Sequence, residues 1–271
     1  MTSTPATLGR TVGHGALAGA VAGCAGAAVM YFLVEPSIRT AIAIEDAASK
    51  AAESSGHSHT HAPGHTHVSS ELVTRGEQVV YGMLTAVVVG TFIGVAFALV
   101  HRYFGRRIAG RGLPGSALIL AALGFLTLTL APAIVIPANP PAVGDPATVN
   151  LRTLTYVGTI VCAVAFTGMV IAASRATSLS TRNRTLAASA VAVAGVMVLL
   201  FGIPNRPDAI PADVPAGLIW SFRLGSIAQL ASMWLVMGAV YGWLATGSRK
   251  SKADTTAHDR AGAPAGPLSS V

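Results

Sequence analysis

The sequence predicts an all-α protein, a polytopic bundle of transmembrane helices. Of its 271 residues, 52% are hydrophobic and only 11% are charged, a composition too apolar for a soluble domain of this size. A helix crosses about 30 Å of hydrocarbon with roughly 20 mostly apolar residues, and six stretches of the chain meet that requirement. Because these stretches are continuous rather than alternating, they do not resemble the strands of a membrane β-barrel.

The predicted spans belong to a single membrane domain, residues 1–248. They cover about residues 13–34, 79–101, 116–136, 153–174, 186–203 and 218–244. The count falls to five if the short fifth stretch, or the sixth with its Arg223, does not cross the membrane. The motif VAGC at 21–24 resembles a lipoprotein processing site, but the apolar run continues to Val34, which favours a retained helix.

Glycines predict how the first two spans pack. Gly15, Gly19 and Gly23 recur every four residues in the first span, and Gly90 and Gly94 repeat that spacing in the second. Small residues at this spacing let two helix backbones approach closely in lipid, so we expect these helices to share a glycine face. Glycines scattered through an alanine-rich chain are the plainer alternative.

The distribution of Lys and Arg predicts on which side of the membrane each loop lies, since cytoplasmic loops retain positive charge. The N-terminal segment, the loops 101–114 and 175–184, and the tail 249–271 together hold twelve basic and two acidic residues, whereas the rest holds six basic and nine acidic residues. Both termini are therefore predicted to be cytoplasmic, with a disordered tail, and the loop 35–78 to be extracytoplasmic. This bias also explains the pI of about 10.0 without a nucleic-acid partner.

The long outer loop carries the most unusual segment, GHSHTHAPGHTH at 56–67. The loop begins with a helix-forming composition and ends in a helix-capping sequence, SSELVTRGEQ. Between them, alternate positions on either side of an Ala-Pro-Gly turn hold His57, His59, His61, His65 and His67. Alternate side chains of an extended chain share one face about 7 Å apart, so modest bending brings these imidazoles onto one ion.

Neutral imidazole binds divalent transition metals, and the lack of a nearby cysteine argues against a closed structural zinc site. We therefore expect this histidine tract to collect metal ions reversibly. A pH-responsive loop and a solvated linker are the alternatives. The tract does not encode selectivity, because imidazole alone favours copper.

A second candidate region is the proline-rich outer loop PANPPAVGDPATVNLR, residues 137–152. It contains Asn139 and Asp145 among four prolines. So many prolines predict a non-helical segment that forms a rigid cap or re-entrant lip over the bundle.

Polar residues in the spans are candidates for a pathway or a gate. Arg223 either snorkels to the interface or faces the bundle and pairs with an acid such as Glu35 or Asp145. Gln229, deeper on the same helix, either lines a pathway or makes an interhelical hydrogen bond. His14 and His101, at the cytoplasmic ends of their helices, either receive a departing ion or are interfacial residues without such a role.

Five motifs occur in order along nearly the whole chain, namely EPSIRTAIAIE, HSHTHAPGHTH, TRGEQ, PANPPAVGDPATVNLR and WSFRLGS. Together they resemble the CbtA family of bacterial cobalt transporter proteins, which are integral to the membrane, and the proline motif is the most specific. The resemblance implies cobalt uptake for cobalamin synthesis, in the bacterial inner membrane, with a small single-span, histidine-bearing B-type subunit. The matching positions are the five tract histidines, Glu35, Asn139, Pro140, Pro141, Asp145 and Arg223.

We therefore expect a permease subunit that carries Co²⁺, with Ni²⁺, Zn²⁺ or Cu²⁺ as further candidates, and that holds no permanent cofactor. The chain lacks the phosphate-binding loop G-x-x-x-x-G-K-[ST], so direct ATP coupling requires another chain. Its spans lack the clustered Asp, Glu or His of a membrane enzyme, so catalysis is not expected. The alternative is a membrane-anchored metal-binding or sensing protein without transport activity. Candidate partners are lipid, the B-type subunit and another copy of the chain.

Overall fold

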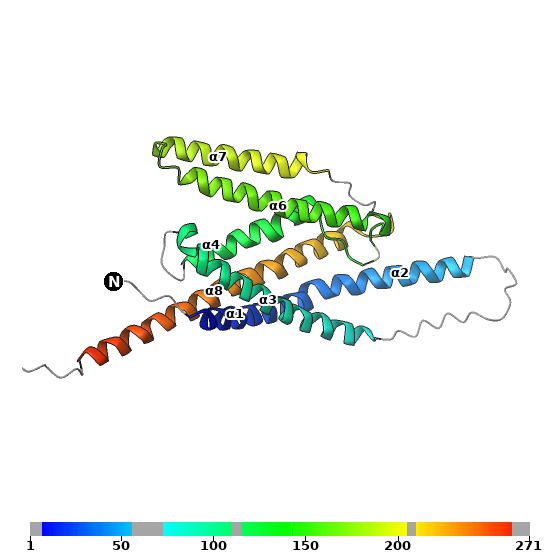
Figure 1. Ribbon diagram of the computed structural model, residues 1–271. Coiled ribbons are helices and arrows are strands. Elements are labelled where there is room, and N and C mark those ends of the chain that lie inside the picture. The colour runs from blue at the N-terminus through cyan, green and yellow to red at the C-terminus, as the bar shows by residue number, and fades with distance from the viewer. Residues whose placement is uncertain (1–6, 56–72, 110–114, 142, 205–209, 262–271) are drawn as a thin grey trace, which may run out of the picture.

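The computed structural model describes residues 7–55, 73–109, 115–141, 143–204 and 210–261. Within these ranges every regular element is a helix, and six helices are long and apolar enough to cross a membrane. They run along one common direction and form an elongated body (Figure 1). The predicted all-α class and the count of six are thereby confirmed.

The helices are joined by connections of very different lengths, the longest of them between Ser55 and Arg75. In chain order they are α1 (Leu8–Val29), the π-helical segment η1 (Met30–Val34), α2 (Glu35–Ser55), α3 (Arg75–Ala109), α4 (Gly115–Gly124), the π-helical segment η2 (Phe125–Leu130), α5 (Ala131–Val135), the 3-10 turn η3 (Pro146–Thr148), α6 (Val149–Ser174), α7 (Thr181–Met197), the π-helical segment η4 (Val198–Gly202) and α8 (Ala216–Ala261).

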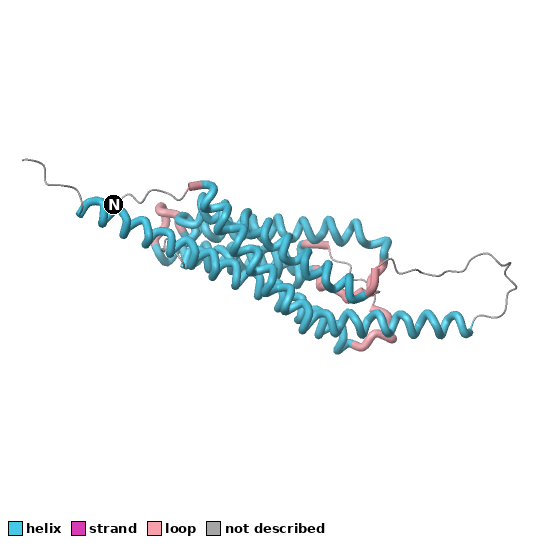
Figure 2. Tube along the Cα trace, turned by 90° about the horizontal axis from the view of Figure 1, so that it is seen from below, coloured by secondary structure: helices cyan, strands magenta, loops and turns pink. Residues whose placement is uncertain are grey.

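Several of these helices extend beyond the predicted spans; α6 and α7, for example, begin at Val149 and Thr181 rather than at 153 and 186. α1 continues through η1 into α2, so the first part of the predicted loop 35–78 is a helix that reaches roughly 30 Å beyond Glu35 (Figure 2). α3 begins at Arg75, before the predicted 79. α8 continues to Ala261, where the sequence predicted a disordered tail from 249. No Gly or Pro interrupts residues 248–261, and extending a formed helix costs far less than nucleating one.

The first two spans pack on the predicted glycine face. A Cβ atom built on Gly15 would lie 2.6 Å from the carbonyl oxygen of Gly94, and one built on Gly23 would lie 2.6 Å from that of Ala86. Gly19 and Gly90 contact each other between these two points. Real Cβ atoms do not approach backbone so closely, so only glycine permits this helix separation, and the prediction is confirmed.

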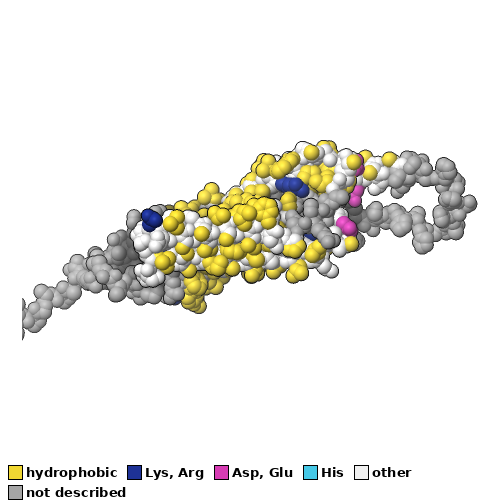
Figure 3. Space-filling view, turned by 90° about the horizontal axis from the view of Figure 1, so that it is seen from above, with side chains coloured by type: hydrophobic (Ala, Val, Ile, Leu, Met, Phe, Trp, Pro, Cys, Tyr) yellow, Lys and Arg dark blue, Asp and Glu magenta, His cyan; other side chains and the backbone are white. Residues whose placement is uncertain are grey.

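The core lies where α1, α3, α4 and α8 meet. Small residues such as Ala18 and Ala98 fill the narrow part, and Phe97, Met237 and Tyr241 fill the wider part. The α6–α7 hairpin packs outside this core and contacts it through η2, α5 and η4. Hydrophobic side chains are spread along the face in view, whereas acidic side chains gather at one end of it (Figure 3). The body thus has the surface of a protein that crosses a membrane.

Candidate functional site

Arg223 binds the proline-rich loop. It lies in the second turn of α8, where its Nε donates to the carbonyl oxygen of Ala138 at 3.1 Å and its terminal guanidinium nitrogen donates to Asn139 Oδ1 at 2.8 Å. The side chain therefore faces the protein, as one alternative held. Its predicted pairing with Glu35 or Asp145 is wrong, because a backbone carbonyl and an amide accept its protons instead.

The proline-rich loop is folded tightly between α5 and α6. Its Pro140 is fully buried, and the Pro140 carbonyl accepts from the Val143 N–H at 3.2 Å in a turn. Gly144 then adopts a φ of 142°, a conformation that side chains other than glycine rarely allow. The irregular part among the described residues is 136–141 and 143–145, so the expectation that the whole of 137–152 is non-helical is wrong at its end, where η3 and α6 begin.

Asp145 starts the next helix. Its Oδ1 accepts from the Ala147 N–H at 2.8 Å, and its carbonyl oxygen accepts from the N–H and the hydroxyl of Thr148. These bonds satisfy the free donors at the start of a helix and position α6 against the loop. Asp145 is exposed, and its bonds to Ala147 and Thr148 are those of a helix cap rather than of a gate.

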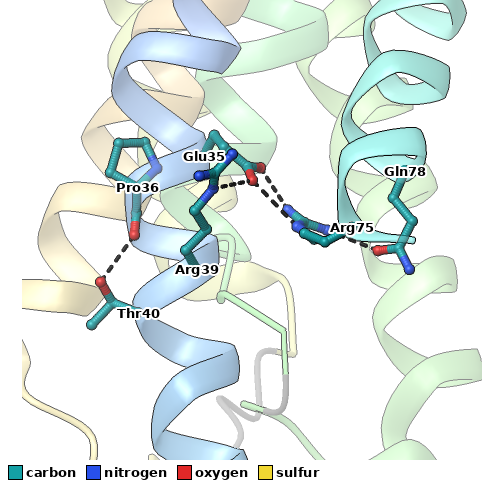
Figure 4. A network of polar contacts seen from close by, with 6 residues as sticks. All are labelled: Glu35, Pro36, Arg39, Thr40, Arg75 and Gln78. Atoms are coloured by element: carbon teal, nitrogen blue, oxygen red, sulfur yellow. Dashed lines mark hydrogen bonds and ion pairs between the residues drawn. The ribbon is translucent and has the colours of Figure 1, made fainter. Parts of the chain in front are cut away.

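Glu35 is a buried carboxylate held by two arginines. It lies where η1 joins α2 and is only 4% exposed. Its Oε1 accepts from Arg39 Nε at 2.8 Å and from Arg75 Nε at 3.2 Å, and its Oε2 accepts from a second Arg75 nitrogen at 2.5 Å (Figure 4). Arg75 also donates to Gln78 Oε1 at 3.0 Å, within the first turn of α3. A charge so deeply buried needs such partners, and both of its oxygens are occupied.

The Glu35 cluster joins three of the spanning helices at one end of the body. Arg75 connects the start of α3 to the end of the first span, and the hydroxyls of Ser37 and Ser221 lie 3.1 Å apart, which connects α2 to α8. Arg223 lies at the same end of the body, but it contacts Asn139 of the proline-rich loop, whereas Glu35 contacts Arg75. The carboxylate of Glu35 is free for a metal ion only after its bonds to Arg75 break.

A small pocket lies at the same end, between α2, the proline-rich loop and the segment 211–214. Its volume is about 190 Å³, and its walls include Ala41 and Ile44 on one side and Pro141 and Val143 on the other. Glu45, Asp213 and Ser49 also line it. Carboxylate and hydroxyl oxygens are ligands for divalent cations, so this pocket can attract such ions by charge. It opens beside the helix that leads to the histidine tract.

The five histidines of the tract lie outside the described residues, which end at Ser55 on α2 and resume at Val73 before α3. Within the described ranges, no group of three or more His, Cys, Asp or Glu residues is placed to hold a metal ion. Metal binding by the tract therefore stays a prediction.

Comparison with known families decides what kind of protein this is. The family model described as "Probable cobalt transporter subunit (CbtA)" matches residues 8–246, which is nearly the whole chain. The chain belongs to the CbtA family. No curated protein and no solved structure matches it.

For this CbtA-family chain, the remaining candidate residues lie apart from the Glu35 cluster. Gln229 is half-buried on α8, and no hydrogen bond of its side-chain amide to another described residue is found, so of its two alternatives the interhelical bond is not seen there. His101 lies at the opposite end of the bundle. Its Nε2 is 2.8 Å from Ser116 Oγ, and its ring packs edge-on against Tyr241 at 5.2 Å.

Sequence reasoning missed Arg75, Glu45 and Asp213. Arg75 is part of the TRGEQ motif, which is a usable signal. Glu45 and Asp213 contribute to that acidic excess, but only the fold shows that they line one pocket. The pocket brings together segments about 170 positions apart in the chain.

Proposed function

We propose that this chain is the permease subunit of a system that carries cobalt into the cell across the bacterial cytoplasmic membrane. The observation that carries the proposal is the family match over residues 8–246, to a family described as probable cobalt transporter subunits. The six apolar helices agree with a protein that forms a passage through a bilayer.

The proposed path of the ion starts at the histidine tract outside the cell. The tract binds Co²⁺ reversibly through imidazole nitrogens and raises its concentration at the end of α2. The pocket with Glu45 and Asp213 lies along the same helix, so its carboxylates are the next groups to attract the ion. Binding must stay weak at each step, because an ion that is held tightly is not passed on.

The proline-rich loop and the Glu35 cluster act as the outer gate in this proposal. Arg223 holds the loop through Asn139, and Arg75 holds the end of α1 through Glu35. Both contacts lie at the end of the body that carries the pocket. Opening a passage there requires one of these contacts to break or shift, which makes them control points rather than metal ligands.

Other proposed features follow from the family and the sequence. A small single-span B-type subunit binds to the chain, and the cobalt supplies cobalamin synthesis. Neither a resident cofactor nor catalysis is part of the proposal, and the coupling energy comes from another source than an ATP-binding loop in this chain. Ni²⁺, Zn²⁺ and Cu²⁺ remain competitors for the same ligands.

Cobalt content measured by mass spectrometry in cells with and without the protein tests the proposal. The B-type subunit is present in both strains, and the medium contains limiting cobalt. Transport predicts more intracellular cobalt in the strain that has the protein. Equal intracellular cobalt, together with metal binding by the purified chain, would instead identify a membrane-anchored metal-binding or sensing protein.

A further inference from the structure

A second cavity, larger than the pocket beside α2, is an apolar groove on the side of the bundle. Its volume is about 690 Å³, and it lies between α3, the α4–η2 segment and α6, with Trp234 of α8 at its floor. The α6–α7 hairpin contacts the core through η2, α5 and η4, near the proline-rich loop. Away from the proline-rich loop, α6 and α4 diverge (Figure 1). The groove lies between the diverging parts of these two helices.

The groove is lined almost entirely by hydrocarbon. Phe97 and Phe104 of α3 face Leu128 of η2 and Ile171 of α6. The hydroxyl of Thr127, which also lines it, donates to the carbonyl oxygen of Leu123 in its own helix at 2.8 Å. Such walls stabilise neither an ion nor ordered water, whereas an alkyl chain gains dispersion contacts along the whole length.

One end of the groove is cationic. Arg175 follows the last residue of α6 and lines the groove, and its side chain is exposed. Among the described residues no ion pair or hydrogen bond of its guanidinium is found, and no acidic residue lines the groove. A guanidinium binds a phosphate diester through two parallel hydrogen bonds, so this end suits an anionic headgroup.

We propose that this groove binds an anionic phospholipid, with an acyl chain between α3 and α6 and the phosphate on Arg175. An amphiphile with one apolar and one anionic end matches both the hydrocarbon walls and the single arginine. A spanning helix of another chain fits less well. The spanning part of such a helix is apolar throughout and offers no anion to the guanidinium of Arg175.

The site requires no particular transported ion, so its test is independent of the proposed function. The full-length protein is purified in detergent, mixed with phosphatidylglycerol or phosphatidylcholine, and examined by native mass spectrometry for retained lipid. The wild type should retain phosphatidylglycerol in preference. Arg175→Gln should reduce that retention by roughly fivefold, while the matched Arg182→Gln, which removes an exposed arginine on α7 outside the groove, should leave it unchanged.

A second variant tests the groove itself. Gly168 lines it, and a Cβ atom at this position would meet nothing within 4 Å, so Gly168→Leu fills the groove without a backbone clash. This variant should lose both lipids. Retention of phosphatidylglycerol equal to that of the wild type in Arg175→Gln or in Gly168→Leu would overturn the proposal. So would an experimental structure with a protein helix in the groove.

Discussion

The bonds between Glu35 and Arg75 should contribute unequally to stability, although the two residues form one ion pair. Glu35 is 4% exposed, whereas the side chain of Arg75 is 35% exposed. Loss of Glu35 leaves an arginine that can reach water or a lipid headgroup. Loss of Arg75 leaves a carboxylate that cannot. Arg75→Met should therefore destabilise the protein more than Glu35→Gln.

The magnitudes follow from the geometry. Removing one partner of a fully buried ion pair costs about 3–5 kcal/mol. Because Arg39 still donates to Oε1, we expect Arg75→Met to lie at the lower limit, about 3 kcal/mol. Glu35→Gln keeps an oxygen acceptor, and the Arg75 side chain that it leaves is already partly exposed to solvent. We therefore expect this variant to lose about 2 kcal/mol of folding free energy. The double variant should cost little more than Arg75→Met alone, which gives a coupling energy of about 2 kcal/mol.

The assay is a double-mutant cycle on the purified protein in lipid nanodiscs, with unfolding by graded denaturing detergent followed by circular dichroism. Arg39→Met is the matched control. It removes an arginine from the same carboxylate, but its side chain is 60% exposed and bonds only within its own helix, so a smaller effect is expected. Additive effects of Glu35→Gln and Arg75→Met, or a larger cost for Glu35→Gln, would refute this account of the buried pair.

Three further predictions concern the glycine face between α1 and α3, the proline-rich loop and the topology. Gly19→Leu should prevent α1 and α3 from packing and lower the yield of folded protein in membranes. Gly13→Leu is the control and should fold, because a Cβ atom there meets nothing within 4 Å; equal yields of the two variants would contradict packing on the glycine face. Asn139→Ala should speed proteolysis of the proline-rich loop, and Arg223→Ala should speed it more because it also removes the bond to the Ala138 carbonyl oxygen; unchanged rates in both variants would show that these contacts do not hold the loop. A cysteine placed at position 60 should react with a membrane-impermeant maleimide from outside intact cells, and labelling only after lysis would reverse the predicted orientation.

The features that the sequence predicted correctly depend on local or periodic patterns. Six apolar runs of sufficient length give six helices, and glycines every four residues give the seam between α1 and α3. A helix cap is also present before the second span, at Thr74, whereas the start of SSELVTRGEQ, where the sequence suggested a cap, lies outside the described residues. The Thr74 N–H donates to Glu77 Oε2 at 2.7 Å, and the Glu77 N–H donates to Thr74 Oγ1 at 3.4 Å.

The features that it missed depend on contacts between distant segments. Arg75 and Glu35 are 40 positions apart, and nothing in either motif shows that α2 continues the first span and places Glu35 beside α3. For Arg223 the sequence offered either an interfacial position or an acidic partner. The turn of the proline-rich loop instead presents the Ala138 carbonyl and the Asn139 amide, and a loop conformation of this kind is not encoded in composition.

The most direct test of the central claim is the initial rate of radioactive cobalt uptake by intact cells, measured over a range of cobalt concentrations. The strains carry wild-type protein, no protein, or a variant in which all five tract histidines are replaced by alanine, each with the B-type subunit. Inward transport predicts saturable uptake that requires the chain. The histidine variant should raise the cobalt concentration for half-maximal uptake more than it lowers the maximal rate, because the tract collects ions before they pass. The same uptake with and without the chain would contradict transport itself.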